Sequence, residues 1–472
     1  MKNKVASAER VSKKVLAKIT PKESEEKAIR RVLDEVLDVT GNLIRPHKLQ
    51  CTLAGSFLRN TWLSDKKEFD IFILFPESCP REVLERKGLE LGKKIVSSLG
   101  GRYQIAYAEH PYVRAEIKGY LVDIVPCYKT ADPSRIKSAV DRTPHHNNYI
   151  LKHLNEKLSG QVRLLKQFCK GIGVYGSDLR VEGFSGYLCE LLIIKHGSFI
   201  SLLREASAWE AGKALIDLEK HGKAAGPAQR KRFLGQPLVV IDPVDHKRNV
   251  AAALSPANFE KFRQSAADFL KSPSEKFFTK ETKTLKSQEL RKLLRERGTE
   301  FLAVKFQRPE VVDDILWPQL RRTCRRIAGV LEGEGFSVLG SDAWCDGGEC
   351  VIFFEMQVWN LPAVRRLTGP PVFSATHSWQ FRKKYRAAGR VWVEGDRWVA
   401  ETERRIPDAM TLLLKLLGTD TDGLMERGIA SYAARSMARN FHILDGSGIL
   451  KYAGRNSDFA QFFAYYFKNR IV

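Results

Sequence analysis

Hydrophobic positions recur along the chain at two spacings, one typical of β-strands and the other typical of α-helices. Between residues 20 and 125, two segments with helical spacing, 20–41 and 80–98, alternate with short apolar runs that predict strands. The strands are expected at 49–53, 71–75, 102–108, 111–118 and 120–125. These elements predict a mixed sheet that is covered on one face by helices.

Capping residues mark two of the helix boundaries. Thr20-Pro21-Lys22-Glu23 combines a capping-box pattern with a proline at the first helical position. A helix is therefore expected to begin there and to end at Gly41. Ser255-Pro256 predicts a second start, because serine caps a helix and proline suits its first turn.

The spacing becomes helical after residue 145 and is mixed again in the C-terminal part. Residues 145–207 include the nearly all-apolar run Phe184–His196, which we expect to be the central helix of a second domain. Residues 221–237 predict a loop, and the charged segment 271–284 predicts a linker. We therefore expect an α+β protein with domains over 1–144, 145–270 and 271–472.

The C-terminal domain is expected to be a second α+β module. Strands are expected at 301–306, 336–339 and 351–358, and helices at 316–332, 406–417 and 429–440. Residues 373–398 interleave aromatic and basic side chains. Such a segment either stacks on RNA bases and contacts phosphates, or forms a β-hairpin with a solvated basic face. The residues alone leave both alternatives open.

The charge and composition of the chain indicate what kind of partner it binds. The chain has 78 Lys and Arg against 55 Asp and Glu, a formal charge of +23, which favours a polyanionic partner over simple solubility. The N-terminus is polar and no apolar run approaches the ~18 residues of a membrane span, so we expect a cytoplasmic protein with no membrane partner. The eight cysteines lack zinc-ligand spacing, which indicates reduced thiols.

Candidate chemistry is concentrated between Gly55 and Asp70 and in one later strand. Gly55-Ser56 follows a predicted strand and opens a short helix, so that backbone N–H groups there could contact a phosphate. Glu68 and Asp70 are two residues apart in a strand and therefore share one face of it. If the strand that carries Asp123 lies beside them, three carboxylates converge.

Three ionised carboxylates that lie close together need a cation to offset their repulsion. Mg²⁺ prefers oxygen ligands and also binds phosphate, so Glu68, Asp70 and Asp123 predict a Mg²⁺ site that promotes attack by a hydroxyl on a nucleotide phosphate. The alternative is a surface turn followed by a strand with solvated acids. The agreement of the turn, the spacing and the third acid favours the catalytic interpretation.

The residues that carry this chemistry resemble those of the nucleotidyltransferase superfamily, which shares its catalytic core with DNA polymerase β. The closer resemblance is to the archaeal, class I CCA-adding enzymes, over about residues 50–325 and in family order. The matching blocks are GSFLRNTWL, EFDIFILFP, YAEHPYV, VDIVPCYK, IKSAVDRTPHH, VEGFSGYLCELL, DPVDHKRNVAA and VKFQRPEVVDDILWPQL. The resemblance implies a nucleotidyltransferase head, a helical central domain and an RNA-recognition-like tail.

The same resemblance implies an activity. It implies addition of C, C and A to the 3′ end of tRNA from CTP and ATP, without a nucleic-acid template and with release of pyrophosphate. A poly(A) polymerase-like RNA nucleotidyltransferase is the alternative, although it does not combine the VDRTPHH, GFSGYLCELL and KRNVAA blocks. A catalytically silent RNA-binding protein is a second alternative, which the complete acid triad argues against. The oligomeric state is left open, with a homodimer among the options.

The resemblance also implies roles for individual side chains. Ser56 and Arg59, which lies one helical turn further on, are expected to hold the triphosphate. His146 is expected to contact the nucleotide, but His145 stands directly beside it, so which of the two makes the contact stays open. His110 is expected only to position other groups.

Residues of the second domain complete the expected site. The resemblance places Lys166 and Tyr175 at the nucleotide, although their separation requires a loop to bring Tyr175 back. It implies that Arg248 reads the incoming base, because a guanidinium has only donors and suits the acceptor edges of cytosine and adenine. Spacing suggests that Asp245 orients Arg248. Glu182 departs from the family, which tends to carry a basic residue there.

Overall fold

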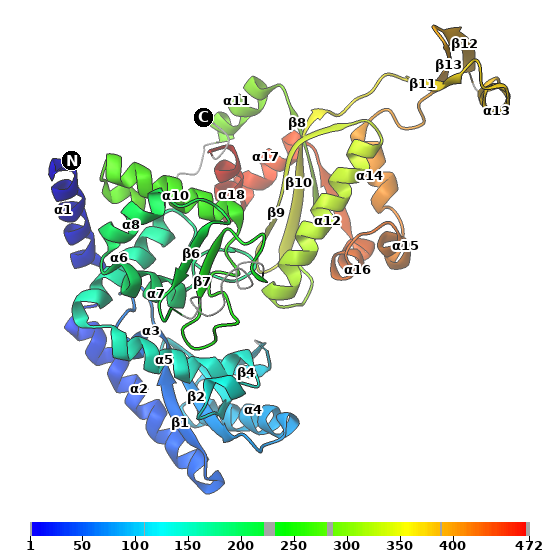
Figure 1. The fold of residues 1–472 in the computed structure, drawn as a ribbon. Helices are drawn as coiled ribbons and strands as arrows, with labels where there is room; N and C mark the ends of the chain where they lie inside the picture. The colour runs from blue at the N-terminus through cyan, green and yellow to red at the C-terminus, as the bar shows by residue number, and fades with distance from the viewer. Residues whose placement is uncertain (1, 108, 221–231, 281–286, 388, 469–472) are drawn as a thin grey trace. The chain divides into compact units, whose positions relative to one another are not determined.

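The computed structural model describes residues 2–107, 109–220, 232–280, 287–387 and 389–468 (Figure 1). The chain forms two compact units, Met1–Glu281 and Thr282–Val472, whose boundary lies inside the charged segment 271–284. Both units combine helices with sheets, so the α+β class is confirmed. The expected loop at 221–237 lies largely outside the described residues.

A five-stranded mixed sheet forms part of the first unit, in the order β1-β2-β5-β4-β3. Its strands are β1 (Gln50–Ala54), β2 (Glu68–Pro76), β3 (Arg102–Tyr107), β4 (Pro111–Ile117) and β5 (Tyr120–Lys129). β2 and β5 are parallel, whereas the other neighbours are antiparallel. All five expected strands are confirmed. β5 is longer than expected because its run of buried residues continues through 125–128.

Helices α2 (Glu23–Ile44) and α4 (Arg81–Ser98) cover one face of this sheet, as expected (Figure 1). Their apolar residues share a core with Phe69, Ile71 and other alternate residues of β2. Because successive side chains of a strand point to opposite faces, Glu68 and Asp70 lie on the face that is turned away from these helices.

The structure corrects both expected ends of α2. The helix begins at Glu23, because Lys22 rather than Thr20 takes the cap position and its backbone N–H bonds to a side chain of the first turn. The helix also continues through Gly41 to Ile44. Ile44 is buried in the core, and this packing outweighs the weak helix propensity of the glycine.

The remainder of the first unit is mainly helical and surrounds an aromatic core. Its elements are α1 (Lys2–Ile19), α5 (Arg142–His153), α6 (Glu156–Gly171), α7 (Gly186–His196), α8 (Phe199–Ser207), α10 (Pro256–Lys271) and the parallel strands β6 (Ala214–Asp217) and β7 (Leu238–Ile241). The ring of Phe168 lies 5.5, 6.0 and 5.9 Å from those of Phe199, Phe262 and Phe269. The N-terminal helix α1 packs against α6 and α10.

Two expectations for this helical part are corrected. α7 begins at Gly186 rather than Phe184, because the Ser185 hydroxyl caps its first turn. The expected linker 271–284 contains a 3₁₀ turn, Glu275–Phe278, and the ring of Phe278 is buried in the aromatic core.

Among the described residues, no single helix is long and apolar enough to cross a membrane. Only the sharply bent pair α7–α8 has the required length and composition in combination.

The second unit is built on a four-stranded antiparallel sheet in the order β14-β8-β10-β9. Its elements are β8 (Glu300–Gln307), β9 (Ser337–Cys345), β10 (Glu349–Val358), β14 (Phe441–Leu444), α11 (Ser287–Arg297), α12 (Asp313–Gly333), α14 (Ala409–Leu417), α15 (Thr421–Glu426), α16 (Ser431–Arg439), α17 (Gly446–Arg455) and α18 (Ser457–Lys468). Phe301 and Phe353 of the sheet pack against Phe463 of α18. The second α+β module is confirmed, and its likeness to an RNA-recognition module stays a prediction.

A smaller three-stranded sheet belongs to the same unit. It contains β11 (Val364–Pro371), β13 (Arg397–Glu403) and β12 (Gly389–Glu394), in that order, with helix α13 (Ala375–Tyr385) packed beside them. A hairpin over the whole of 373–398 is therefore wrong, because the first half of this segment is helical. Within the described part of this segment, β12 and the start of β13 form a hairpin.

Candidate active site

The predicted acids lie where β2 and β5 run side by side. Asp70 and Asp123 are directly opposite each other in this parallel pair, and Glu68 precedes Asp70 on the same face of β2. Burial, together with the negative charges of Asp123 and Glu68, raises the pKa of Asp70 to about 6. A carboxyl group in such surroundings favours the approach of a cation.

Basic side chains pair with the negatively charged carboxylates of Glu68 and Asp123. Lys66 Nζ lies 2.5 Å from a Glu68 oxygen, and the Arg114 guanidinium donates to both oxygens of Asp123 at 2.8 and 2.7 Å. As these side chains lie, no three His, Cys, Asp or Glu groups in the described part of the chain are gathered closely enough to hold a metal ion. The pairing of Asp70 with Asp123 is observed, whereas a closed set of three ligands is not.

The chemistry of these side chains nevertheless fits a divalent cation. Asp70 has a raised pKa, faces two further acids and offers the oxygen ligands that such cations prefer. Lys66 and Arg114 are long side chains with 35% and 44% exposure, so they can turn toward solvent and release Glu68 and Asp123. Glu68, Asp70 and Asp123 therefore stay the predicted metal ligands.

Gly55 brings the predicted phosphate-binding turn against Asp70. β1 ends opposite Asp70, and the single helical turn α3 (Gly55–Leu58) follows at once. The backbone of Gly55 has a φ of +81°, and a Cβ atom at this position would lie 2.0 Å from Asp70 Oδ2. Only glycine meets both conditions without strain. Ser56, the predicted triphosphate ligand, is the next residue of this half-buried turn.

Arg59 and Lys166 meet at a buried carboxylate, that of Glu190, which was not among the predicted site residues. Glu190 of α7 is fully buried and accepts hydrogen bonds from the Thr61 hydroxyl at 2.6 Å and from Lys166 Nζ at 3.4 Å. Arg59 Nε lies 3.1 Å from its second oxygen, and Arg59 also donates to Asn147 at 2.6 Å. Two cations share one anion here, so the cluster retains positive charge that suits phosphate.

Lys166 and Tyr175 come together despite their separation in sequence. A Cβ atom on Gly186 would lie 3.3 Å from the Tyr175 hydroxyl and 3.6 Å from Lys166 Nζ. Tyr175 returns to this place because it forms a β-bridge with Phe184, just before α7. Burial lowers the pKa of Lys166, and the charge of Glu190 opposes that shift. The contacts of Lys166 and Tyr175 with a nucleotide stay predictions.

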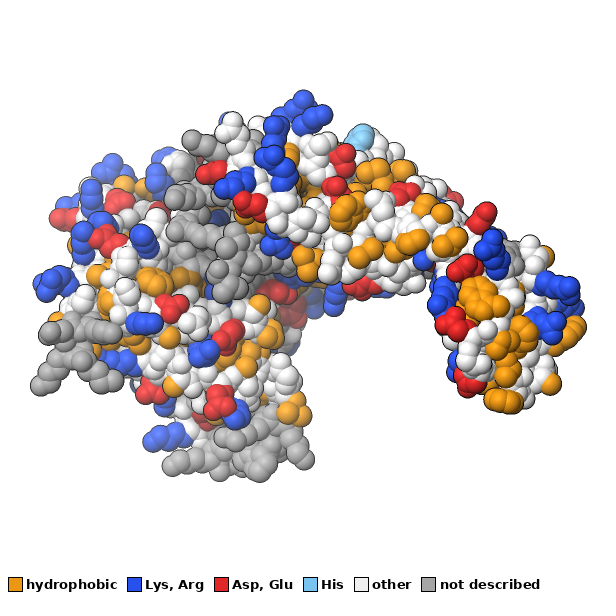
Figure 2. Space-filling view, turned by 90° about the horizontal axis from the view of Figure 1, so that it is seen from above, with side chains coloured by type: hydrophobic (Ala, Val, Ile, Leu, Met, Phe, Trp, Pro, Cys, Tyr) orange, Lys and Arg blue, Asp and Glu red, His pale blue; other side chains and the backbone are white. Residues whose placement is uncertain are grey.

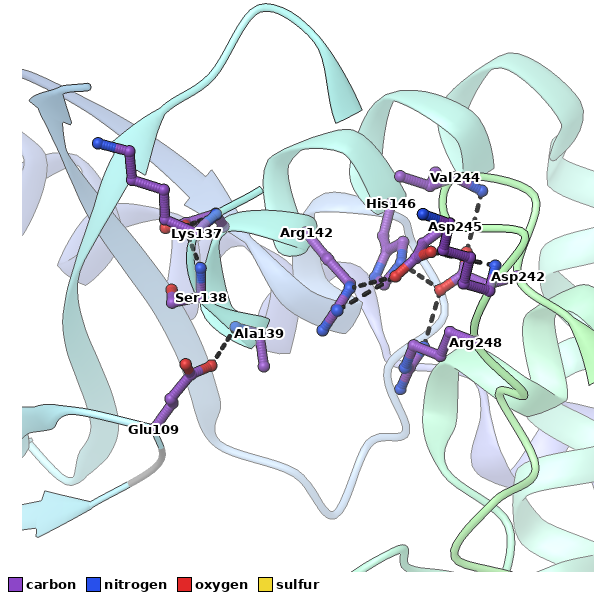
Figure 3. A network of polar contacts seen from close by, with 12 residues as sticks. Glu109, Lys137, Ser138, Ala139, Arg142, His146, Asp242, Val244, Asp245 and Arg248 are labelled. Carbon is purple, nitrogen blue, oxygen red and sulfur yellow. Dashed lines mark hydrogen bonds and ion pairs between the residues drawn. The ribbon is translucent and has the colours of Figure 1, made fainter. Parts of the chain in front are cut away.

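His146 and Arg248 meet at a second buried carboxylate, that of Asp242 (Figure 3). Asp242 accepts hydrogen bonds from His146 Nε2 at 2.9 Å and from an Arg248 Nη atom at 2.8 Å. The expectation that Asp245 orients Arg248 is wrong, since the Asp245 carboxylate lies 3.1 Å from the Arg142 guanidinium instead. The turn after β7 points the two carboxylates toward different arginines.

The tandem histidines have different partners. His146 joins Asp242, whereas His145 Nε2 forms a hydrogen bond with the Thr130 hydroxyl at 2.8 Å. This arrangement favours His146 over His145 as the nucleotide contact, which stays a prediction.

His110 is buried just before β4, and its burial lowers its pKa.

Glu190 and Asp242 do carry a signal in the sequence. Glu190 is an acid inside the otherwise apolar segment GYLCELLII, and Asp242 directly follows the apolar strand LVVI. Acids are rarely buried without partners, so an acid in such a place predicts a paired carboxylate. Lys66 and Arg114 stand among many basic residues and carry no comparable signal.

A second candidate surface lies on the module formed by β11, β12, β13 and α13. Figure 2 shows hydrophobic and basic side chains gathered on this module, at the right of the view. Phe373 is 87% exposed and Trp379 is 61% exposed. Lys383 Nζ lies 4.8 Å from the centre of the Trp379 ring, and Arg382 lies 5.0 Å from that of Trp398. Exposed rings beside cations favour contact with RNA over a merely solvated face.

Three family models match successive parts of the chain. The nucleotidyltransferase domain matches residues 31–146, the second domain of tRNA nucleotidyltransferase matches 160–279, and the C-terminal domain of CCA-adding enzyme matches 297–445. The first match includes the acids and the Gly55 turn. The nucleotidyltransferase family implies the use of a divalent metal ion, in agreement with the chemistry of the three carboxylates.

Archaeal CCA-adding enzymes are similar to this chain along most of their length. The enzyme from Methanocaldococcus jannaschii is 41% identical over 406 residues, 85% of this chain and 88% of that protein. The enzyme from Archaeoglobus fulgidus is 37% identical over 462 residues, 94% and 96% of the two chains. The enzyme from Haloarcula marismortui is 36% identical over 471 residues, 95% and 97% of the two chains. The chain therefore belongs to the family of CCA-adding enzymes, the tRNA nucleotidyltransferases of the nucleotidyltransferase superfamily.

Proposed function

We propose that this chain adds C, C and A in turn to the 3′ end of tRNA, using CTP and ATP and releasing pyrophosphate. One observation carries the proposal: Asp70 and Asp123 face each other beside the Gly55 turn, in a chain of the CCA-adding family. The tRNA 3′-hydroxyl attacks the α-phosphate of the bound nucleotide, and no nucleic-acid template takes part.

We assign Mg²⁺ to Glu68, Asp70 and Asp123. The repulsion between these carboxylates, which contributes to the raised pKa of Asp70, decreases when they share a divalent cation. A bound Mg²⁺ would stabilise the charge that develops on the reacting phosphate. Asp123, whose side chain is 18% exposed, is assigned to align the 3′-hydroxyl.

We assign the triphosphate to Ser56 and Arg59. Arg59 and Lys166 share a single buried carboxylate, so their combined positive charge is only partly neutralised and can serve phosphate oxygens. Lys166, Tyr175 and His146 are assigned to the nucleotide, on the wall that the helical part of the first unit provides.

Choice of the base is assigned to Arg248. Its guanidinium offers only donors and therefore matches acceptor atoms on the cytosine edge and the adenine ring nitrogen. Uracil and guanine present donors at those places, which would leave N–H groups unpaired at a cost in binding free energy. UTP and GTP are therefore expected to be poor substrates.

The second unit and the overall basic charge are assigned to tRNA. The net charge of +23 and the exposed rings of Phe373 and Trp379 support this assignment. The division into a head over 1–144, a helical domain over 145–270 and a tRNA-binding part over 271–472 stays a proposal. The oligomeric state stays open, with a homodimer among the options, and a cytoplasmic location remains a prediction.

Incubation with tRNA that lacks its last three nucleotides tests the proposed function. With CTP and ATP, we expect a product that is extended to the full CCA end, whereas CTP alone should allow only the two C additions. A poly(A) polymerase would make long A tails and would not use CTP. A silent RNA-binding protein would leave the tRNA unchanged. Either of the last two results would contradict the proposal.

Gly55→Ala is expected to lower kcat/KM for nucleotide addition by about 100-fold, because a displacement of about 1 Å at a reacting group has an effect of this size. The added Cβ would collide with the Asp70 carboxylate and would require a left-handed backbone. Gly100→Ala is a matched control, since Gly100 has a φ of +65° but no atom within 4 Å of its Cβ position. Steady-state kinetics of both variants check the expectation, and a normal rate for Gly55→Ala would contradict it.

A further inference from the structure

Asp242 directly follows β7, and Figure 3 shows its carboxylate joined by dashed lines to His146, Val244 and Arg248. Asp242 is fully buried. One of its oxygens accepts hydrogen bonds from His146 Nε2 at 2.9 Å and from an Arg248 Nη atom at 2.8 Å. The other accepts from the backbone N–H of Val244 at 3.0 Å and from the Tyr187 hydroxyl at 3.3 Å. A single acid therefore joins four donors from three parts of the first unit.

These contacts determine the protonation of the network. Burial alone would raise the pKa of Asp242, but its contact with His146, the hydrogen bond from the Val244 N–H and the charge of Arg248 together hold that pKa below its ordinary value. Burial lowers the pKa of His146. The imidazole is therefore neutral near neutral pH, and its proton lies on Nε2, which faces the carboxylate. The ring of His146 also stacks on that of Tyr187, with centroids 4.0 Å apart. Asp242 thus holds one tautomer and one orientation of His146.

The rest of the Arg248 guanidinium is available to a ligand. Asp242 engages one Nη atom, and no other hydrogen bond to this guanidinium occurs among the residues that the structure describes. The side chain is 38% exposed and borders a pocket of about 380 Å³. Other residues that line the pocket are Ser177, Ser185, Phe233, Gln236 and Asn249. A guanidinium held at one end presents its remaining donors in a fixed direction.

We propose that Asp242 is a positioning residue that fixes the Arg248 guanidinium and thereby determines which bases the site accepts, while it also holds one tautomer of His146. The inference rests on the proposed function, because it assumes that Arg248 faces the incoming base. An untethered arginine can follow the acceptor atoms of several bases. A tethered one leaves donors unpaired against the wrong base, and this difference provides the discrimination.

Nucleotide selection by the Asp242→Asn variant tests this inference. The tRNA lacking its CCA end is offered CTP or UTP singly, and kcat/KM is measured for each. We expect the ratio of CTP to UTP to fall by about tenfold or more in Asp242→Asn. A merely structural defect would lower both values together and would leave the ratio unchanged. Asp245→Asn is the matched control, because Asp245 pairs with Arg142 and should keep the wild-type ratio.

Two further variants keep the test decisive if the amide disturbs folding. Asp242→Ser is smaller than aspartate and can still accept from the Val244 N–H, so it preserves the turn while removing the carboxylate. It should lose discrimination as Asp242→Asn does. Adding Asp242→Ser to Arg248→Ala should cause no further loss of the ratio, because Asp242 acts through Arg248.

The outcomes separate this inference from the proposed function. A wild-type protein that does not extend tRNA with CTP would overturn the proposed function. A wild-type protein that extends tRNA and rejects UTP, together with folded Asp242 variants that reject UTP equally well, would overturn only the role of Asp242. Independent, additive losses in the Asp242→Ser/Arg248→Ala double variant would also overturn that role.

Discussion

Asp70→Asn is expected to reduce nucleotide addition by about 10³-fold or more while leaving tRNA affinity nearly unchanged. The amide keeps the volume of the side chain but removes the charge that a divalent cation needs at this position. The basic surface that attracts tRNA is not altered. Single-turnover incorporation and a direct tRNA-binding measurement check the two parts of the expectation. Incorporation at the wild-type rate would remove Asp70 from the reaction.

The same substitution is expected to stabilise the metal-free protein at neutral pH. The pKa of Asp70 is raised from 3.8 to about 6 in the folded protein, so the folded state binds its proton more tightly than the unfolded state. Above pH 6 the ionised carboxylate therefore destabilises the fold, by about 2–3 kcal/mol. As the pH falls through 6 toward 4, this penalty disappears. An amide at position 70 does not ionise, so the variant does not have this destabilisation at any pH.

Thermal unfolding in a chelator, at about pH 5 and about pH 7.5, checks this second expectation. The stability difference between Asp70→Asn and the wild type should be larger at the higher pH, where Asp70 is ionised. The comparison between the two proteins cancels the contributions of titrating groups that do not interact with Asp70. A difference that does not change with pH would show that Asp70 does not have the raised pKa. Greater stability together with lost activity is the expected mark of an acid held in place for catalysis.

Glu190→Gln is expected to destabilise the first unit by about 3–5 kcal/mol, because removing one partner of a buried ion pair leaves charge uncompensated. Glu190 is fully buried, and Arg59 and Lys166, whose side chains are 10% and 3% exposed, both depend on it. Burial alone would raise the pKa of Glu190, but its two cations hold it below the ordinary value. The carboxylate is therefore ionised at neutral pH, and its charge is what the amide removes.

A lower midpoint of thermal unfolding, by about 5–10 °C, would show this loss in the full chain. Glu90→Gln is the matched control, since the Glu90–Lys94 pair is exposed and such pairs contribute little. The double variant Glu190→Gln/Lys166→Met should be more stable than Glu190→Gln alone, because it removes one of the unpaired cations. If Glu190→Gln and Glu90→Gln had equal midpoints, Glu190 would not be the residue that holds Arg59 and Lys166 together.

The local pattern of apolar and polar residues was sufficient to predict the strands of the first sheet. It was also sufficient to place Glu68 and Asp70 on one face of β2. The strands follow from short apolar runs, and Glu68 and Asp70 share a face because side chains alternate along β2. Local pattern failed where burial against distant segments outweighed it. Gly41 does not end α2 because Ile44 is buried, and residues 275–278 of the charged segment form a 3₁₀ turn because Phe278 packs in the aromatic core.

Residue order and local spacing were enough to identify the charged groups, to place some of them on a common strand or helix, and to reveal the family resemblance. Which charged groups come into contact depends on the packing of remote segments. Asp123 faces Asp70 because β5 pairs with β2, and Glu190 holds Arg59 because α7 packs beside the turn after β1. Arg248 is paired with Asp242 rather than Asp245 by a turn that spacing alone does not define. Electrostatic partners are selected by distance in space, and distances between remote segments arise only when the core is packed.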